Sequence, residues 1–249
     1  MQESPSSLLR FSLRIAKESA RILQRMQDNA KIAVNKIKGD FALDSDIASE
    51  NHILKRIKQK YLGHDILTEE SKHEHQQSDY LWVIDPLEGT LNYAHKLPVW
   101  AVNVGLFYKR KPLLGVIYAP VLKELFHAVK GEGAYLNGKR IHVNNDTDLM
   151  KSFFAVPAAQ INEIPISKTI IRGIGCAGVE LAYVACGRFG ARIKLRGADP
   201  YGYGAGSIIV LEAGGKITDS RGQNWTLTSD SSITSNGKLH DKLVKLLNQ

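Results

Sequence analysis

The sequence predicts an α+β fold, with helices and strands separated in its first half and mixed in its second. Residues 8–28 and a stretch from about residue 45 carry apolar residues at helical spacing. Residues 80–141 contain a run of short apolar segments divided by turn residues, which is typical of strands. Beyond about residue 150, strand and helix patterns alternate. Together these patterns indicate layered helices and sheets.

The bulk composition is that of a globular protein. The chain has 249 residues, of which 43% are hydrophobic and 23% are charged. No apolar run reaches the roughly 20 residues that cross a bilayer, and the N-terminus lacks the apolar core of a signal peptide. The two cysteines form no metal or redox motif, so we expect a reducing, cytoplasmic location.

The net charge of +8 has three interpretations. The lysines are scattered, which favours an ordinary solvated surface over a nucleic-acid or membrane site. Residues 55–60 form the outer face of a predicted helix, and residues 109–111 form a predicted hairpin tip. A basic field could also attract anionic substrates such as phosphate esters.

The first half begins with two amphipathic helices. The apolar stripe predicted for the first helix consists of Leu9, Leu13, Ala16, Ala20, Leu23 and Met26. The second helix begins near Ser45 and Asp46, which are good capping residues. Its predicted stripe is Ile47, Ile53, Leu54, Ile57 and Tyr61.

The strands follow these helices. Residues 80–84 form a continuous apolar strand that is predicted to end at Asp85-Pro86, and Asn137-Gly138 marks a hairpin turn. Further strands are predicted at 65–68, 100–107, 113–118, 124–129, 153–156, 170–174, 216–218 and 231–234. Further helices are predicted at 179–187, 205–213 and 238–247. We expect two packed halves, 1–145 and 146–249.

The segment Asp85-Pro86-Leu87-Glu88-Gly89-Thr90 carries the clearest chemical signal. A buried strand delivers Asp85 to its end, and one tight turn can bring Glu88 back to the same place. Gly89 lets the backbone approach a ligand closely, and carboxylate and carbonyl oxygens suit Mg²⁺. Alone, the segment could equally be a strand followed by a capped turn.

Two other acidic positions strengthen the magnesium interpretation. Glu69-Glu70 follows a strand that would end at the same crevice, and Asp46 begins an acidic helix. Taken separately, the first pair could be surface charge and the second a helix cap.

Five segments in order make the chain resemble the inositol monophosphatase family of Mg²⁺-dependent phosphatases. They are residues 68–71, 85–92, 133–141, 172–177 and 205–215. The resemblance implies the layered αβαβα sandwich that this family shares with fructose-1,6-bisphosphatases. It also implies a cytoplasmic homodimer that hydrolyses phosphate monoesters, such as inositol monophosphate or a related sugar phosphate, with Mg²⁺.

The resemblance also implies roles for individual residues. Thr90, Asp46 and Glu69 would activate a metal-bound water as the catalytic group. The metal ligands would be Glu69, Asp85, the carbonyl of Leu87, and Glu88. The substrate would contact Gly89, Thr90, Gly175, Cys176 and Ala177.

Two departures from the family pattern concern the second metal. Glu88 stands where the family has aspartate, and Gly202 stands where the family has a third metal-binding aspartate. Asp199, three residues earlier, is either a replacement ligand or simply part of an Asp-Pro turn. Without a replacement, the resemblance implies reduced phosphatase activity.

The specificity region leaves further alternatives open. Lys194 and Arg196 flank the place of the family's inositol-binding glutamate. They could favour a bisphosphate or a 3′-nucleotide phosphate, or they could be solvated residues on a strand. Some bacterial relatives bind the transcription machinery, so a catalytically impaired chain that contacts RNA polymerase or RNA is another alternative.

Overall fold

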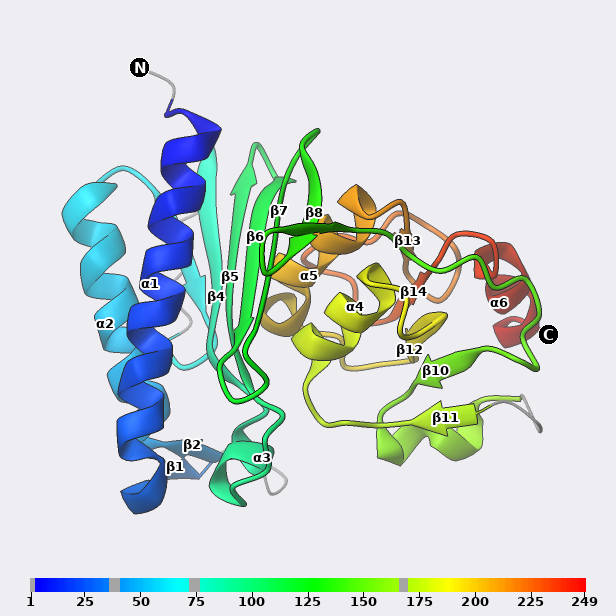
Figure 1. Ribbon diagram of the computed structural model, residues 1–249, viewed down its shortest axis with the longest axis horizontal. Helices are drawn as coiled ribbons and strands as arrows, with labels where there is room; N and C mark the ends of the chain where they lie inside the picture. Colours follow the sequence, from blue (N-terminus) through cyan, green and yellow to red (C-terminus); the bar gives the residue numbers. More distant parts are fainter. Residues whose placement is uncertain (1–2, 36–40, 72–76, 166–169) are drawn as a thin grey trace.

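Helices and sheets alternate in five layers across the molecule, in the order helix, sheet, helix, sheet, helix (Figure 1). The computed structural model describes residues 3–35, 41–71, 77–165 and 170–249. The predicted α+β class and its αβαβα layering are both confirmed. None of the helices in these ranges is long and apolar enough to span a membrane.

The outer layer is the helix pair α1 (Pro5–Met26) and α2 (Asp44–Lys60). The hydroxyl of Ser4 caps α1, and Pro5 occupies a first-turn position where a backbone N–H would have no intrahelical acceptor. The buried face of α1 runs through Leu8, Phe11 and Ile15, whereas the predicted Leu9 and Leu13 are only partly buried. Helical spacing fixes the period of the stripe, but not which of several adjacent apolar residues points inward.

The first sheet has seven strands in the order β3-β4-β5-β6-β7-β8-β9. Only β3 and β4 are parallel, and the other neighbours are antiparallel. The strands are β3 (Asp65–Thr68), β4 (Tyr80–Glu88), β5 (Ala101–Tyr108), β6 (Lys111–Ala119), β7 (Glu124–Val129), β8 (Gly133–Leu136) and β9 (Lys139–Ile141). The predicted turn at Asn137-Gly138 joins β8 to β9, and both residues have positive φ.

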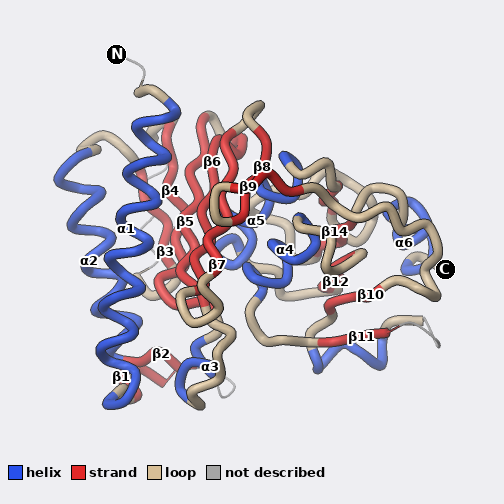
Figure 2. The backbone as a smooth tube through the Cα atoms, in the orientation of Figure 1, coloured by secondary structure: helices blue, strands red, loops and turns tan. Residues whose placement is uncertain are grey.

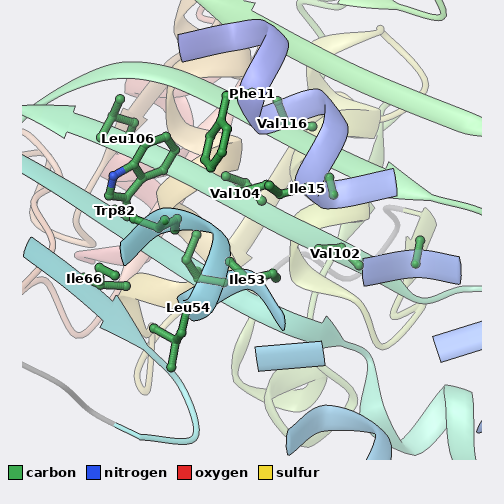
Figure 3. Close-up of a cluster of buried hydrophobic side chains, with 14 of the residues drawn as sticks. Phe11, Ile15, Ile53, Leu54, Ile66, Trp82, Val102, Val104, Leu106 and Val116 are labelled. Atoms are coloured by element: carbon green, nitrogen blue, oxygen red, sulfur yellow. The ribbon is translucent and has the colours of Figure 1, made fainter. Parts of the chain in front are cut away.

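A large apolar core lies between the helix pair and this sheet (Figure 3). Phe11 and Ile15 of α1 and Ile53 of α2 face Trp82 and Val104 of the central strands. Burial of such side chains contributes roughly 1.5–3 kcal/mol each, so this core fixes α2 against β4. That contact determines where the first turn of α2 meets the end of β4.

The middle layer consists of α4 (Ala177–Ala185) and α5 (Pro200–Glu212), which lie between the two sheets (Figure 2). Small residues allow α5 to approach its neighbours closely. A Cβ on Gly115 of β6 would lie 2.3 Å from the carbonyl oxygen of Ala205, and one on Gly206 would lie 2.5 Å from a methyl of Leu181. The run of glycine and alanine in α5 is therefore a packing requirement.

The second sheet has five strands in the order β11-β10-β12-β14-β13. They are β10 (Phe153–Ala155), β11 (Ile170–Arg172), β12 (Ala191–Lys194), β13 (Lys216–Thr218) and β14 (Ser232–Ser235). Helix α6 (His240–Leu247) covers its outer face. Since the first sheet ends at Ile141 and the second begins at Phe153, we propose that they correspond to the predicted halves, 1–145 and 146–249.

Several boundaries differ from the sequence-based predictions. Strand β4 continues to Glu88 instead of ending at Asp85-Pro86, and α5 begins at Pro200 instead of residue 205. The sequence patterns missed β1 (Ile32–Asn35), β2 (Phe41–Leu43), β12, α3 (Thr90–Ala94) and the 3-10 helices Gln27–Asn29 and Ala158–Glu163. The missed elements are short, so they carry too little of a helical or strand pattern to be recognised.

A buried histidine joins α6 to the second sheet. His240 is 1% exposed, and its two ring nitrogens lie 2.9 Å from the hydroxyls of Ser235 and Thr218. Burial, with a smaller effect of Lys216, lowers the pKa of His240 from 6.5 to about 4. The imidazole is therefore neutral in the folded protein at neutral pH.

We predict that protonation of this histidine destabilises the fold in weak acid. The unfolded chain binds a proton near pH 6.5 but the folded protein binds it only near pH 4, so this contribution to stability is intact above pH 6.5. It falls as the pH drops through that window, by on the order of 2–3 kcal/mol. Urea unfolding from pH 7.5 to 4.5 should show a smaller loss for His240→Gln than for wild type. His142→Gln, at an exposed histidine, should behave like wild type, and equal losses in all three proteins would contradict the prediction.

Candidate metal centre

The end of β4 bends where the sequence places its acidic turn. Asp85 pairs with Asn103 of β5, and the register then shifts before Glu88 pairs with Ala101. Pro86 lies inside this irregularity, where it need not donate a ladder hydrogen bond. Asp85 is 3% exposed, and its carboxylate accepts a hydrogen bond from the backbone N–H of Leu87 at 3.1 Å. The bend therefore turns two carboxylates of one strand toward one place.

Gly89 ends the bend and begins α3. Its φ of +84° is in the left-handed region, and a Cβ there would lie 3.1 Å from the carbonyl oxygen of Val99. The hydroxyl of Thr90 lies 3.2 Å from Asp46 Oδ1 and 3.1 Å from the carbonyl oxygen of Leu87, both of which can accept its hydrogen. Glycine is thus required for the turn that presents Thr90.

The first turn of α2 reaches the same point. Asp46 is 1% exposed, and its Oδ2 accepts the backbone N–H of Leu43 at 3.1 Å. One turn later, the Ser49 hydroxyl donates to the carbonyl oxygen of Pro86 at 2.8 Å. These bonds attach α2 to the bend, so the Asp46–Thr90 contact is rigidly placed.

Glu88 points inward, although the residue as a whole is partly exposed. Its Oε1 accepts the backbone N–H of Ala177, at the start of α4, at 3.0 Å. Its Oε2 accepts the side-chain amide of Asn103 at 3.0 Å. Burial, followed by the charge of Asp199, raises the pKa of Glu88. Glu88 thereby connects the first sheet to the middle layer.

Asp199 reaches the cavity from the start of α5. It caps α5, and its Oδ1 accepts the backbone N–H of Gly202 at 2.8 Å. The cavity at this point has a volume of about 390 Å³ and is lined by Glu69, Asp85, Leu87, Glu88, Gly89, Thr90, Leu91, Gly175, Asp199 and Tyr201. Burial raises the pKa of Asp85 well above its ordinary value, and the charges of Glu69, Glu88 and Asp199 raise it further. Four carboxylates thus share one cavity.

This donor set fits Mg²⁺. The cavity offers carboxylate oxygens and the Leu87 carbonyl, which are hard ligands, and its lining residues include no histidine. Over the described ranges, no three His, Cys, Asp or Glu side chains already stand together as a compact ligand group. The four carboxylates instead surround a cavity, with Asp85 and Glu88 in hydrogen-bond contact. Positive charge within the cavity would relieve their repulsion.

The model of the inositol monophosphatase family matches residues 4–249. The chain belongs to the inositol monophosphatase family. The resemblance predicted from the five sequence segments is therefore confirmed.

Several relatives match most of the chain in sequence. The chain is 32% identical to the inositol-1-monophosphatase of Bacillus subtilis over 93% of this chain and 92% of the relative. It is 33% identical to a fructose-1,6-bisphosphatase/inositol-1-monophosphatase of Thermotoga maritima, over 84% of this chain and 83% of the relative. It is also 33% identical to Nus factor SuhB of Pasteurella multocida, over 89% and 88%.

Solved structures agree with this family. A Thermotoga maritima IMPase superposes with a TM-score of 0.91 at 30% identity, over 97% of both chains. The inositol monophosphate-bound SaIMPase-II superposes with a TM-score of 0.85 at 25% identity, over 97% of this chain and 94% of the other.

The inositol monophosphatase fold brings most of the predicted site residues together. Glu69, Asp85, Leu87, Glu88, Gly89, Thr90, Gly175 and Asp199 line the cavity, and Asp46 contacts Thr90. Cys176 and Ala177 contact Glu88 instead: the Cys176 thiol lies 3.7 Å from the Glu88 carbonyl oxygen. Lys194 and Arg196 lie outside the residues that line this cavity, and Arg196 pairs with Glu163.

Sequence reasoning missed three residues that organise this site. Asn103 is fully buried in β5 and donates to Glu88. Glu50 accepts the backbone N–H of Glu70 at 3.0 Å and the hydroxyl of Ser71, which anchors the loop that carries Glu69. Its position four residues after Asp46, on the same helix face, is a signal that could have identified it.

The third missed residue is Arg192, which forms a buried ion pair with Glu180. Arg192 Nε lies 2.7 Å from Glu180 Oε2, and both side chains are 3% exposed. The other carboxylate oxygen of Glu180 accepts the backbone N–H of Ile174 at 2.9 Å. Arg192 also lies over the Tyr203 ring, 4.8 Å from its centroid, so it connects α4, α5 and β12.

We predict that Glu180→Gln destabilises the protein strongly, by about 3–5 kcal/mol, because it leaves the Arg192 charge buried without its partner. Urea unfolding at neutral pH measures the loss. Glu180→Leu/Arg192→Met removes both charges and should be more stable than Glu180→Gln.

The exposed Lys216–Asp241 pair provides the control. Their distance is 2.9 Å, similar to that of the buried pair, but Asp241 is 88% exposed. Asp241→Asn should cost much less stability than Glu180→Gln, because water solvates the exposed partner. Similar losses for Glu180→Gln and Asp241→Asn would contradict the assigned role of burial.

Proposed function

We propose that the protein is a Mg²⁺-dependent phosphoric monoester hydrolase acting on a small phosphate ester such as inositol monophosphate. The convergence of four carboxylates and the Asp46–Thr90 pair on one cavity carries this proposal. Membership of the inositol monophosphatase family supports it. The structurally similar SaIMPase-II binds inositol monophosphate, which supports the substrate class.

Different residues of this chain would bind the metal and orient the attacking water. Glu69, Asp85, the Leu87 carbonyl, Glu88 and Asp199 would hold Mg²⁺. When bound, Mg²⁺ supplies an acidified water and neutralises phosphate charge. With the Leu87 carbonyl on the metal, Asp46 would accept the Thr90 hydroxyl hydrogen, and the lone pairs of the Thr90 oxygen would stay available. Thr90 could then accept a hydrogen from the attacking water and orient it.

The backbone near Gly89 and Thr90, with Gly175, would contact the phosphate ester. Gly89 allows close approach because it has no side chain at the cavity edge. Lys194 and Arg196 are not among the lining residues, so they give little support to a bisphosphate preference. We therefore favour a substrate with a single phosphate group, such as inositol monophosphate, over a bisphosphate or a 3′-nucleotide phosphate.

Phosphate release tests this proposal. Purified protein with Mg²⁺ should release phosphate from inositol monophosphate, and chelation should stop it. Fructose 1,6-bisphosphate and 3′-phosphoadenosine phosphates test the alternative substrates. No turnover of any of these esters in excess Mg²⁺ would refute a phosphatase function.

We predict that Asp85→Asn lowers kcat/KM by about 1,000-fold, which corresponds to roughly 4 kcal/mol of lost transition-state stabilisation. Asp79→Asn is the matched control, because Asp79 is exposed and pairs with Lys109 away from the cavity. Steady-state kinetics with both variants check the prediction. Equal activity of wild type and Asp85→Asn would contradict the role of this carboxylate.

A second candidate function is binding of a polyanion such as RNA. The relative named Nus factor SuhB and one surface of α1 favour it. Arginine and lysine recur along the exposed face of this helix: Arg10, Arg14, Lys17, Arg21 and Arg25. Phosphate contacts by such residues give salt-dependent binding.

Fluorescence anisotropy with a labelled single-stranded RNA tests this second function. We predict that Arg10→Glu/Arg21→Glu weakens binding at least about tenfold at low salt, while Lys123→Glu/Lys151→Glu, at lysines elsewhere on the surface, has a much smaller effect. Absence of RNA binding by wild type, or equal loss of binding in both variants, would refute this second function.

The cytoplasmic location and the homodimer that the sequence led us to expect remain predictions.

A further inference from the structure

Glu88 and Gly202 occupy the same small volume. A Cβ built on Gly202 would lie 2.7 Å from Glu88 Oε2, closer than Cβ atoms approach other heavy atoms in folded proteins. It would lie 3.3 Å from the Ala177 side chain and 3.5 Å from Asp199 Oδ1. The first turn of α5 therefore has no room for a side chain at residue 202 while Glu88 keeps its position.

The position of Glu88 is itself strongly determined. One carboxylate oxygen accepts the Ala177 N–H at the start of α4, and the other accepts the Asn103 amide, both at 3.0 Å. Asn103 has little freedom to move, because it is fully buried and a Cβ on Gly178 would lie 2.6 Å from its Nδ2. To relieve a clash at residue 202, Glu88 would have to shift against these two hydrogen bonds.

The length of the glutamate makes this arrangement possible. An aspartate at residue 88 would hold its carboxylate back by one carbon–carbon bond, about 1.5 Å. It would lose reach to Ala177 and leave a gap beside Gly202. The longer side chain of Glu88 thus extends a carboxylate across the cavity to the first turn of α5.

We propose that Glu88 and Gly202 act as one unit, in which Glu88 places a metal-binding carboxylate beside that of Asp199 at the α5 side of the cavity, where residue 202 supplies none. This inference rests on the proposed Mg²⁺ function only for its metal-binding part. The steric part concerns the metal-free protein. The unit maintains a carboxylate facing α5 and attaches the start of α4 to the same group.

Four variants separate packing from metal binding. Gly202→Ala should lower the Tm of metal-free protein by roughly 5 °C, because it overpacks the first turn of α5. Glu88→Asp/Gly202→Ala should recover most of this loss, since the shorter carboxylate vacates the space. Glu88→Asp/Gly202→Asp should recover it too and return a carboxylate to the α5 side.

Titration with Mn²⁺, followed by the electron paramagnetic resonance of the free ion, gives the second readout. Glu88→Asp and Glu88→Asp/Gly202→Ala should each weaken Mn²⁺ binding at least about tenfold. Glu88→Asp/Gly202→Asp should bind within about threefold of wild type. The two double variants therefore differ in Mn²⁺ affinity but not in packing.

Gly204 provides the matched control on the same helix. A Cβ there would lie 2.8 Å from a Val83 methyl, so Gly204→Ala should also lower the Tm. Because Glu88 is not the obstructing group, Glu88→Asp should give Gly204→Ala no recovery. Equal recovery at both positions would show a general effect of Glu88→Asp and overturn the proposal.

The remaining outcomes are equally decisive. Failure of Glu88→Asp to raise the Tm of Gly202→Ala would overturn the steric unit. Unchanged Mn²⁺ binding by Glu88→Asp would overturn the metal-binding role, even if the Tm values behave as expected. Failure of wild type to hydrolyse phosphate esters would instead refute the proposed function, and the Tm comparison would remain valid.

Discussion

The concentration of negative charge at the end of β4 is the constraint on which the arrangement of this protein depends. Asp85 is buried beside Glu69, Glu88 and Asp199, and burial together with these charges raises its pKa. Such a cluster is stable only if each carboxylate has nearby donors that partly compensate its lost hydration. The elements around the cavity are placed so that they provide those donors.

Backbone N–H groups perform much of this compensation. Asp46 accepts from Leu43, Asp85 from Leu87, Glu88 from Ala177 and Asp199 from Gly202. Each of these donors lies at a helix start or a bend, where N–H groups have no acceptor within the element. The cluster therefore forms where α2, α4 and α5 begin around the bend of β4. Oriented backbone dipoles reduce the repulsion while leaving the outer carboxylate lone pairs available to a cation.

The sequence alone was sufficient to predict the positions of site residues that belong to a strong local pattern. Asp85 and Thr90 follow a continuous apolar strand, and Asp46 begins a periodic helix, so their meeting could be predicted from element order. The fold class and family followed from five segments in order, and both were confirmed. The start of α5 was misplaced because its first two turns contain three glycines, Gly202, Gly204 and Gly206, and have no apolar period. Asp199 could therefore not be recognised as its cap.

Asn103 and Glu50 illustrate a different limit. Neither belongs to a motif, and each acts through a partner distant in the sequence: Asn103 through Glu88, and Glu50 through the loop at Glu70. The role of Asn103 depends on the register of β5, and the helical spacing from Asp46 places Glu50 on the correct face of α2 but does not identify the loop that it contacts. Lys194 and Arg196, which the resemblance placed near the substrate, are not among the residues that line the cavity.

The buried Glu180–Arg192 pair is best explained by the same constraint. A pair of apolar residues in its place would often give equal stability, so a net gain in folding free energy does not explain the ion pair. Arg192 favours the charged form of Glu88, while Glu180 holds the backbone of Ile174 near Gly175 at the cavity edge. The positive charge of Arg192 thus acts on one member of the carboxylate cluster. It also fixes the geometry of α4, whose first N–H binds Glu88. A cation in the cavity and this buried arginine would then both favour the charged form of the same glutamate.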